Sequence, residues 1–240
     1  MAKRFQVSDF VYAHRGLWTM SGPAENSMEA FLAAASQGLG IEFDVRPAAD
    51  GVPMIFHDPI LDRMTQATGW VEAHSSSELA DIPLKNGGRM STLQDLLDNW
   101  PSETPLLCEL KIDGTTDPVS FAKTVATHFE SHSGPAAMMS FSRDAVAAIP
   151  DSIMRGQLIL PSAQSGATDL AATPIVSVDY LACHTSDAEN VTLQAARAQM
   201  PLVTWTVIDV EASERLAPFT DSQIFEAFDP ALAKRHILNT

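Results

Sequence analysis

Residues 12–58 of this sequence contain side chains of the types that divalent-metal and phosphate chemistry requires. Carboxylate oxygens bind hard divalent cations, histidine exchanges protons near neutral pH, and the planar guanidinium of arginine fits a phosphate group. These types occur in five short stretches: His14-Arg15-Gly16, Glu25-Asn26-Ser27, Ile41-Glu42-Phe43-Asp44-Val45, Asp50-Gly51 and His57-Asp58. If the fold brings these stretches together, they predict a metal-dependent phosphodiesterase.

Glu42 and Asp44 are two residues apart in a stretch typical of a strand, so their side chains share one face. Ile41, Phe43 and Val45 occupy the other face, where covering helices would bury them. Two carboxylates turned into the same interior repel each other unless a cation lies between them, and a divalent ion with oxygen ligands would do this. The alternative is an exposed edge strand with two solvated acids.

The stretch Leu106-Leu107-Cys108-Glu109-Leu110-Lys111 repeats this spacing. Glu109 and Lys111 share one face of the expected strand, and Leu106, Cys108 and Leu110 point to the other. In a strand next to that of Glu42 and Asp44, Glu109 would supply a third carboxylate, and Lys111 would neutralise a phosphate oxygen. Taken alone, the pair reads as a surface ion pair.

Four further residues are of types that suit a site. His14 and Arg15 end the first expected strand, and catalytic groups of parallel barrels lie at the carboxyl ends of strands. Asn26 precedes an expected helix, so it either caps that helix or hydrogen-bonds a phosphate or a metal ligand. Trp205 ends a later strand, where it either lines the pocket against the carbon skeleton of a substrate or packs in the core.

Short strand-like stretches alternate with amphipathic helical stretches along the whole chain, which favours βα units and a parallel sheet. Eight units in 240 residues predict a closed (β/α)₈ TIM barrel of the α/β class, forming a single domain over residues 1–240. The expected strands are Phe10–Ala13, Gly40–Val45, Leu106–Lys111, Ala136–Ser140, Arg155–Leu160, Ile175–Tyr180, Leu202–Val207 and Gln223–Glu226.

The segment between Asp44 and His57 interrupts this alternation, because its twelve residues are too few for a helical crossover. Asp50-Gly51 favours a two-residue hairpin turn. With these two residues at the tip, Asp44 pairs with His57, and paired residues have side chains on the same face. We therefore expect Val52–His57 to be a return arm over the barrel mouth that brings His57 next to the acids.

The net charge of −15 argues against nucleic-acid binding, which usually needs a basic face, and against attraction to an anionic membrane. The first residues have no apolar run of the signal-peptide type, and no stretch has the length of a membrane span. Cys108 and Cys183 have a spacing that suggests neither a zinc site nor a disulfide framework. We expect a cytoplasmic protein without stable membrane association.

The pattern resembles the glycerophosphodiester phosphodiesterase family. The order and spacing of the stretches quoted above match that family, and so do several later ones: Leu61-x-Arg63-x-Thr65, Gly69, Glu109-Leu110-Lys111, Ser140-Phe141 and Trp205-Thr206-Val207. The resemblance implies a TIM barrel of the type found in phosphatidylinositol-specific phospholipases C. It also implies that residues from about 59 to 88 form an insertion capping the barrel mouth.

The resemblance further implies site roles. Glu42, Asp44 and Glu109 would bind one divalent metal ion, Mg²⁺ or Ca²⁺, and His14 and His57 would be the acid–base pair. Arg15 and Lys111 would contact phosphate, and we add Asn26 and Trp205 as substrate-binding candidates. One departure lies at the last strand, where Glu226-Ala227 replaces the Thr-Asp or Thr-Asn that the family commonly has.

The expected activity is metal-dependent hydrolysis of small-molecule glycerophosphodiesters to sn-glycerol 3-phosphate and an alcohol, within glycerol and lipid metabolism, by a monomer or homodimer. One alternative is a lysophospholipase-D-like activity on lysophospholipids. A metal-dependent barrel lyase would use the same residue types, and a non-catalytic barrel that binds phosphate esters would have lost catalytic groups. The expected catalytic groups are all present in this sequence.

Overall fold

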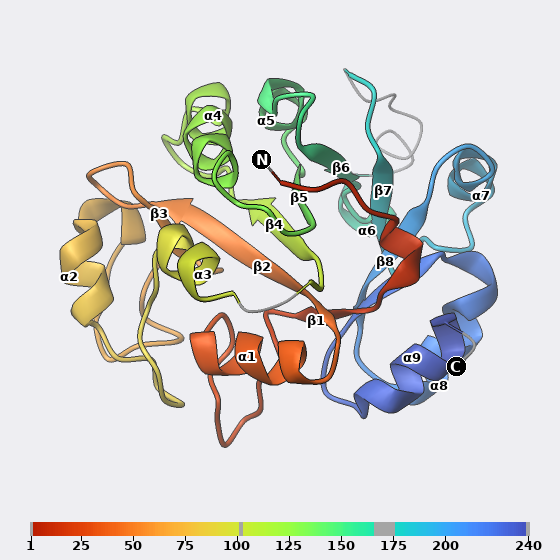
Figure 1. Ribbon diagram of the computed structural model, residues 1–240, viewed down its shortest axis with the longest axis horizontal. Helices are drawn as coiled ribbons and strands as arrows, with labels where there is room; N and C mark the ends of the chain where they lie inside the picture. Colours follow the sequence, from red (N-terminus) through yellow and green to blue (C-terminus); the bar gives the residue numbers. More distant parts are fainter. Residues whose placement is uncertain (1, 101–102, 166–175, 239–240) are drawn as a thin grey trace.

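The computed structural model describes residues 2–100, 103–165 and 176–238. Within them, eight parallel strands close into a barrel in the order β1-β9-β8-β7-β6-β5-β4-β2, with β1 paired to β2 (Figure 1). The expected TIM barrel is therefore confirmed. The barrel strands are β1 (Tyr12–His14), β2 (Gly40–Pro47), β4 (Leu106–Leu110), β5 (Ala136–Ser140), β6 (Met154–Leu158), β7 (Tyr180–His184), β8 (Leu202–Val207) and β9 (Ser222–Phe225).

Helices surround the barrel (Figure 1), and most begin directly after a residue whose side chain caps the helix. They are α1 (Met28–Ser36), α2 (Ser76–Asp81), α3 (Leu93–Asn99), α4 (Pro118–Phe129), α5 (Arg143–Ala148), α6 (Ser162–Ser165), α7 (Val191–Arg197), α8 (Val210–Leu216) and α9 (Pro230–Leu238). Short 3₁₀ turns are η1 (Val7–Asp9), η2 (Val71–Ala73) and η4 (Ala217–Phe219). Across the described ranges, no helix combines the length and apolarity that a membrane crossing requires.

Seven of the eight expected strands lie within two residues of the observed ends. The exception is the stretch Ile175–Tyr180, of which Ile175 lies outside the described residues. There the strand β7 begins only at Tyr180, because Leu181 pairs with Leu202 of β8 and Gly156 of β6 pairs with Tyr180. Pairing with neighbours therefore outweighs the β-branched composition of the preceding residues.

Strand parity divides the apolar residues into two layers. Ile41, Phe43 and Val45 of β2 are fully buried in the layer between barrel and helices, as are Leu106 and Cys108 of β4. The barrel interior is packed by a second cluster that comprises Val7, Tyr12, Leu107, Ala137, Met139, Met154, Leu158, Tyr180, Ala182, Val203 and Ile224. The acids of β2 and β4 therefore point into the barrel, as the alternation predicts.

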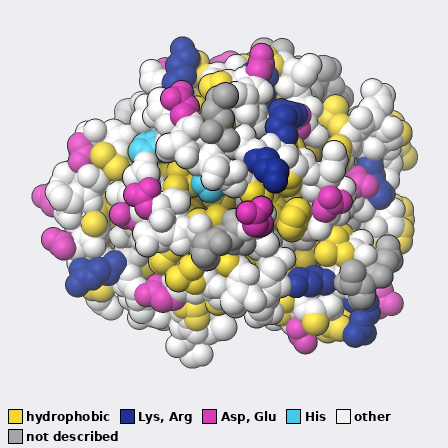
Figure 2. Space-filling model, viewed as in Figure 1, with side chains coloured by type: hydrophobic (Ala, Val, Ile, Leu, Met, Phe, Trp, Pro, Cys, Tyr) yellow, Lys and Arg dark blue, Asp and Glu magenta, His cyan; other side chains and the backbone are white. Residues whose placement is uncertain are grey.

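The N-terminal segment closes one end of the barrel. Val7 is buried in the interior cluster, and the hydroxyl of Tyr12 donates to its carbonyl at 2.9 Å. Lys3 pairs with Pro135, just before β5 begins. Figure 2 shows the face that this segment crosses, with acidic and basic side chains interspersed over it. The amino ends of the strands are thus covered, and a site has to lie at their carboxyl ends.

The return arm exists as β3 (Pro53–Ile55), which runs antiparallel to β2. Its register is shifted by one residue from the prediction, because Val45 pairs with Ile55 and the Phe56 amide donates to the Asp44 carbonyl at 3.0 Å. The predicted pairing of Asp44 with His57 is therefore wrong.

The shift arises in the turn, which contains three residues instead of two. Ala48 donates to the Val52 carbonyl, and the Gly51 amide donates back to Ala48 with Gly51 at φ +81°. A glycine in this left-handed conformation closes a three-residue hairpin loop with a bulge. His57 reaches the mouth beyond the paired part of the arm, where Arg46 Nε donates to its carbonyl at 2.7 Å.

The segment 59–88 lies beside β3 and contains η2 and α2 (Figure 1). Its buried apolar residues form a third cluster with Ala24, Ala48, Met54, Phe56 and Met90: Leu61, Met64, Val71, Leu79 and Leu84. This cluster anchors the segment on the residues that flank β2 and β3.

Candidate active site

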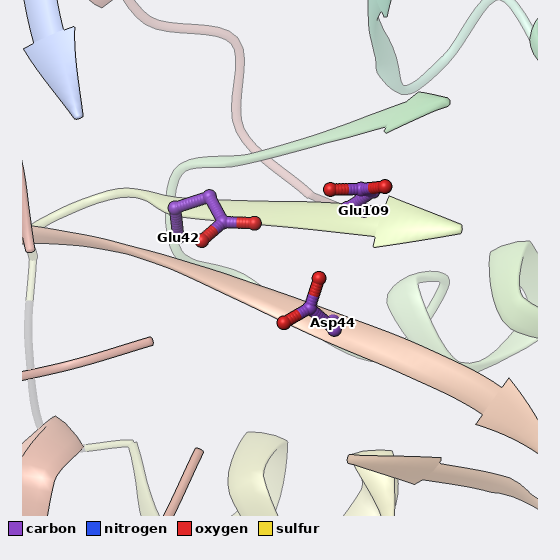
Figure 3. A group of neighbouring side chains, drawn as sticks. All are labelled: Glu42, Asp44 and Glu109. Carbon is purple, nitrogen blue, oxygen red and sulfur yellow. The ribbon is translucent and has the colours of Figure 1, made fainter. Parts of the chain in front are cut away.

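Three acidic side chains meet inside the barrel. Glu42 and Asp44 project from β2, Glu109 projects from the adjacent β4, and each offers an oxygen within 4.8 Å of the others (Figure 3). Asp44 and Glu109 are direct partners in the β2–β4 register. All three residues are buried, so the alternative of solvated acids on an edge strand is wrong.

The charges around this cluster leave one carboxylate poorly compensated. Burial, Asp44 and Glu109 raise the pKa of Glu42 well above its ordinary value. Although burial opposes ionisation, Lys111 and Arg15 hold the pKa of Asp44 well below its usual range. Glu42 Oε2 is buried and has no hydrogen-bond partner among the described residues. An all-oxygen donor set with an unpartnered buried oxygen fits a hard divalent cation such as Mg²⁺ or Ca²⁺.

Two cationic side chains border the acids. Lys111 Nζ lies 2.7 Å from Glu109 Oε1 and 2.9 Å from Asp44 Oδ1. Arg15 Nη1 donates to Glu25 at 2.8 Å, and Arg15 Nε lies 3.4 Å from Asp44 Oδ2. Both cations also line the cavity at the mouth, where a phosphate group could contact them.

The backbone around Arg15 is held in an uncommon conformation. Arg15 and Asn26 have φ angles of +56° and +55°, which residues other than glycine rarely adopt. The Arg15 amide donates to the Glu42 carbonyl at 2.8 Å, and the Asn26 amide donates to the Arg15 carbonyl at 2.9 Å. Strained conformations of this kind persist where surrounding contacts fix them, and they cluster at functional sites.

Asn26 contacts an acid of the cluster. Its Nδ2 donates to Asp44 Oδ2 at 2.9 Å, and its side chain is buried. The cap of α1 is the next residue, Ser27, whose hydroxyl accepts the Ala30 amide. The alternative that Asn26 caps the helix is therefore wrong, and the hydrogen bond to a candidate metal ligand is present.

Each candidate histidine has a carboxylate at Nδ1. His14 Nδ1 lies 2.6 Å from Glu226 Oε2, and His57 Nδ1 lies 2.7 Å from Asp58 Oδ1. A carboxylate accepts the Nδ1 proton, so Nε2 is the ring nitrogen that can exchange a proton with a bound group. His14 Nε2 lies 3.8 Å from Glu42 Oε2. Burial lowers the pKa of both histidines, although these acids act in the opposite direction.

The cavity between these groups has a volume of about 140 Å³. Its polar part comes from β1, β2, β4 and the loop after β3, and comprises His14, Arg15, Glu42, His57, Glu109 and Lys111. Its other part comes from the strands on the opposite arc of the barrel and comprises Met139, Phe141, Leu158, Trp205, Thr206 and Ile224. The Trp205 ring contacts Phe141 and His184 edge-on, with centroids 5.5 and 5.3 Å apart. Trp205 therefore lines the cavity, as one of its two expected roles requires.

Sequence reasoning missed the site contacts of two residues, Glu226 and Arg63. The hydrogen bond from His14 to Glu226 follows from barrel closure, since Ala13 pairs with Phe225 and the next residues then lie side by side. Arg63 belongs to the family stretch Leu61-x-Arg63-x-Thr65, from which no role for Arg63 is predicted. In the structure it contacts Glu25 and Asp58. Placing the last strand of the predicted barrel beside the first would have predicted the contact between Glu226 and His14.

Comparison with known proteins gives a consistent result. The model of the Glycerophosphoryl diester phosphodiesterase family matches residues 14–220. The putative glycerophosphodiester phosphodiesterase YhdW of Bacillus subtilis is 34% identical over 111 residues, which is 42% of this chain and 44% of the relative. A probable glycerophosphodiester phosphodiesterase 2 of Mycobacterium tuberculosis is 39% identical over 90 residues, 37% of this chain and 34% of the relative. These alignments span less than half the length of the curated relatives.

Solved structures share the fold over nearly the whole chain. A phosphodiesterase of Oleispira antarctica in complex with the product sn-glycerol-3-phosphate has a TM-score of 0.77 at 22% identity, covering 96% of this chain and 97% of that one. A glycerophosphodiester phosphodiesterase of Thermotoga maritima has a TM-score of 0.74 at 23% identity, covering 90% and 93%.

Proposed function

Since the chain belongs to the glycerophosphoryl diester phosphodiesterase family, we propose that it hydrolyses glycerophosphodiesters to sn-glycerol 3-phosphate and an alcohol with the help of one divalent cation. One observation carries the proposal: a buried cluster of three carboxylates adjoins two histidines and two cations in one cavity. The fold shared with a phosphodiesterase in complex with the product sn-glycerol-3-phosphate supports the choice of substrate.

Glu42, Asp44 and Glu109 would hold the cation, Mg²⁺ or Ca²⁺, and Asn26 would orient the Asp44 carboxylate by its hydrogen bond. Such a cation, when bound, supplies Lewis-acid polarisation of a phosphoryl oxygen. Arg15 and Lys111 bind the phosphate and share its negative charge. Asn26 and Trp205 remain candidates for direct substrate contact, with Trp205 against the carbon skeleton.

His14 and His57 exchange the protons of the reaction. One imidazole accepts a proton from the nucleophile, and the other gives a proton to the departing alkoxide oxygen. The nucleophile is water, or the glycerol 2-hydroxyl followed by opening of a cyclic phosphate by water. The second route gains from the proximity of an intramolecular attack.

A lysophospholipid is the second candidate substrate, because an apolar groove of about 570 Å³ lies beside the loops after β1 and β9. Leu17 and Trp18 follow the Arg15 turn, and Phe228 follows Glu226, so the groove adjoins the loops that carry site residues. An acyl chain would bury apolar surface there.

We further propose that residues 59–88 cap the mouth and that the protein works in the cytoplasm, as a monomer or homodimer, in glycerol and lipid metabolism. Both cysteines, Cys108 and Cys183, are buried free thiols, which is compatible with a reducing compartment.

A substrate panel tests the proposed function. The protein is treated with a chelator, Mg²⁺ or Ca²⁺ is added back separately, and release of sn-glycerol 3-phosphate is measured from glycerophosphodiesters with different alcohols. Lysophosphatidylcholine is assayed beside glycerophosphocholine by release of choline, because its cleavage leaves lysophosphatidic acid and not sn-glycerol 3-phosphate. We expect metal-dependent release from glycerophosphodiesters, and its absence with every substrate and both metals would overturn the proposal. Higher turnover of lysophosphatidylcholine would favour the second candidate.

Glu226 gives a separate prediction, since its carboxylate orients His14. Replacing Glu226 with Ala should lower kcat about 10- to 100-fold, the usual effect of losing the partner that orients a histidine of the site. KM should change less than about twofold, because Glu226 holds a proton-exchanging group and not the phosphate. Steady-state kinetics test this prediction. The control is Glu189→Ala, because Glu189 is an exposed glutamate paired with Arg215. A change confined to KM would contradict it.

A further inference from the structure

One guanidinium outside the cavity binds two carboxylates at once. Arg63 donates to Glu25 through Nη1 at 2.9 Å and through Nη2 at 2.6 Å. It also donates to Asp58 through Nε at 2.6 Å and through Nη2 at 3.1 Å. Both contacts are therefore two-pronged, a geometry that the planar fork of arginine allows and lysine does not.

Each of these carboxylates in turn contacts a residue of the cavity. Glu25 accepts from Arg15 Nη1 at 2.8 Å, and Asp58 lies 2.7 Å from His57 Nδ1. Glu25 is 6% exposed, so its place between the two arginines is well defined. A continuous chain of charged contacts thus runs from the proposed phosphate ligand, through Arg63, to a proposed acid–base histidine.

The position of Arg63 is fixed from its own segment. Lys85 Nζ donates to the carbonyls of Asp62 and Arg63 at 2.7 and 2.8 Å. Leu61 and Met64, on either side, are buried in the apolar cluster of the segment. The Arg63 side chain therefore extends from an anchored backbone toward the barrel.

We propose that Arg63 is a positioning residue that fixes Arg15 and His57 relative to each other by sharing the carboxylates of Glu25 and Asp58 with them. Without it, Glu25 would pair with Arg15 alone and compete with a phosphate for that guanidinium. Asp58 would lose the contact that holds its carboxylate against His57. The proposal rests on the proposed function, and it gives the segment 59–88 a part in ordering the site.

The charge balance agrees with this arrangement. Although burial opposes its ionisation, hydrogen bonds from Arg63 and the charge of Arg15 lower the pKa of Glu25. Hydrogen bonds from Arg63 and His57 lower the pKa of Asp58 against a similar burial effect. Both carboxylates are therefore ionised at neutral pH and available for the shared contacts.

Arg63→Met tests the proposal through two readouts, with Arg63→Lys as a milder change that keeps the charge. Binding of inorganic phosphate in the presence of Mg²⁺, measured by calorimetry, should weaken about tenfold in Arg63→Met, or about 1.4 kcal/mol. The value of kcat should fall about 10- to 100-fold. Arg63→Lys should give smaller losses in both. Arg89→Met is the matched control, because Arg89 is exposed and donates to the Asp81 carbonyl near the same segment.

Combined variants separate positioning from a general loss of stability. Arg63→Met should weaken phosphate binding less than about twofold further in an Arg15→Met background, and should lower kcat little further in a His57→Gln background, since groups acting through one another are not additive. Fully additive losses, or equal losses in Arg89→Met, would overturn the inference while leaving the proposed function intact. Phosphate binding without turnover in the wild type would overturn the proposed function alone, and absence of both would overturn both.

Discussion

Replacing Asp44 with Asn should lower kcat about 1,000-fold or more and remove the response of the protein to divalent cations. Asp44 lies where Asn26, Arg15 and Lys111 converge, and it is the direct partner of Glu109 in the barrel. The amide keeps the size of the side chain but presents an N–H₂ group and no charge. Losing several kcal/mol of charge stabilisation at the reacting phosphate corresponds to this change in rate.

Thermal unfolding gives a readout that is independent of turnover. A cation at 100 times its Kd stabilises the folded protein by about 2.7 kcal/mol, so the Tm of the wild type should rise by several degrees with Mg²⁺ or Ca²⁺. The Tm of Asp44→Asn should not respond. Asp187→Asn is the matched control, because Asp187 is also a buried aspartate, accepts a hydrogen bond from Ser162 and does not line the cavity. If the Asp44→Asn variant is active and its Tm responds to the cation, the three carboxylates are not the metal site.

The acid cluster could be predicted from the sequence because it depends on short-range rules. A two-residue alternation places Glu42 with Asp44, and Glu109 with Lys111, on the inner face of their strands. Adjacent barrel strands then bring the two pairs together. The exact register, which aligns Asp44 with Glu109, is not needed to predict that the acids meet. The parity is robust because burial of the opposite apolar face fixes it.

The hairpin shows where such counting fails. Asp50-Gly51 has the composition of a two-residue turn, yet the loop holds three residues, and the one-residue difference changes every pairing beyond it. Contacts of long side chains were harder still to predict. Arg63 and Glu25 are 38 residues apart, and their contact depends on how the segment 59–88 folds back on the barrel. No local pattern encodes that path.

Replacing either His14 or His57 with Gln should lower kcat about 10²- to 10⁴-fold, the usual contribution of a general acid or base. His128→Gln should leave kcat unchanged, because His128 is half-buried outside the cavity and bonds Gln94. Near-wild-type turnover of either site variant would exclude that histidine from proton transfer.

A change of leaving group assigns the two roles. An alcohol of low pKa, such as p-nitrophenol, departs without a proton from the enzyme, so the variant that lacks the acid should recover most of its lost rate with a p-nitrophenyl glycerophosphate ester. The variant that lacks the base should retain its full deficit, because the nucleophile still has to lose its proton. If His14 is the base, Glu226 stabilises the imidazolium that forms when His14 takes that proton, and Glu226→Ala should then, like His14→Gln, keep its own deficit with both leaving groups. If instead His57 is the base, the same relation should hold between His57 and its partner Asp58.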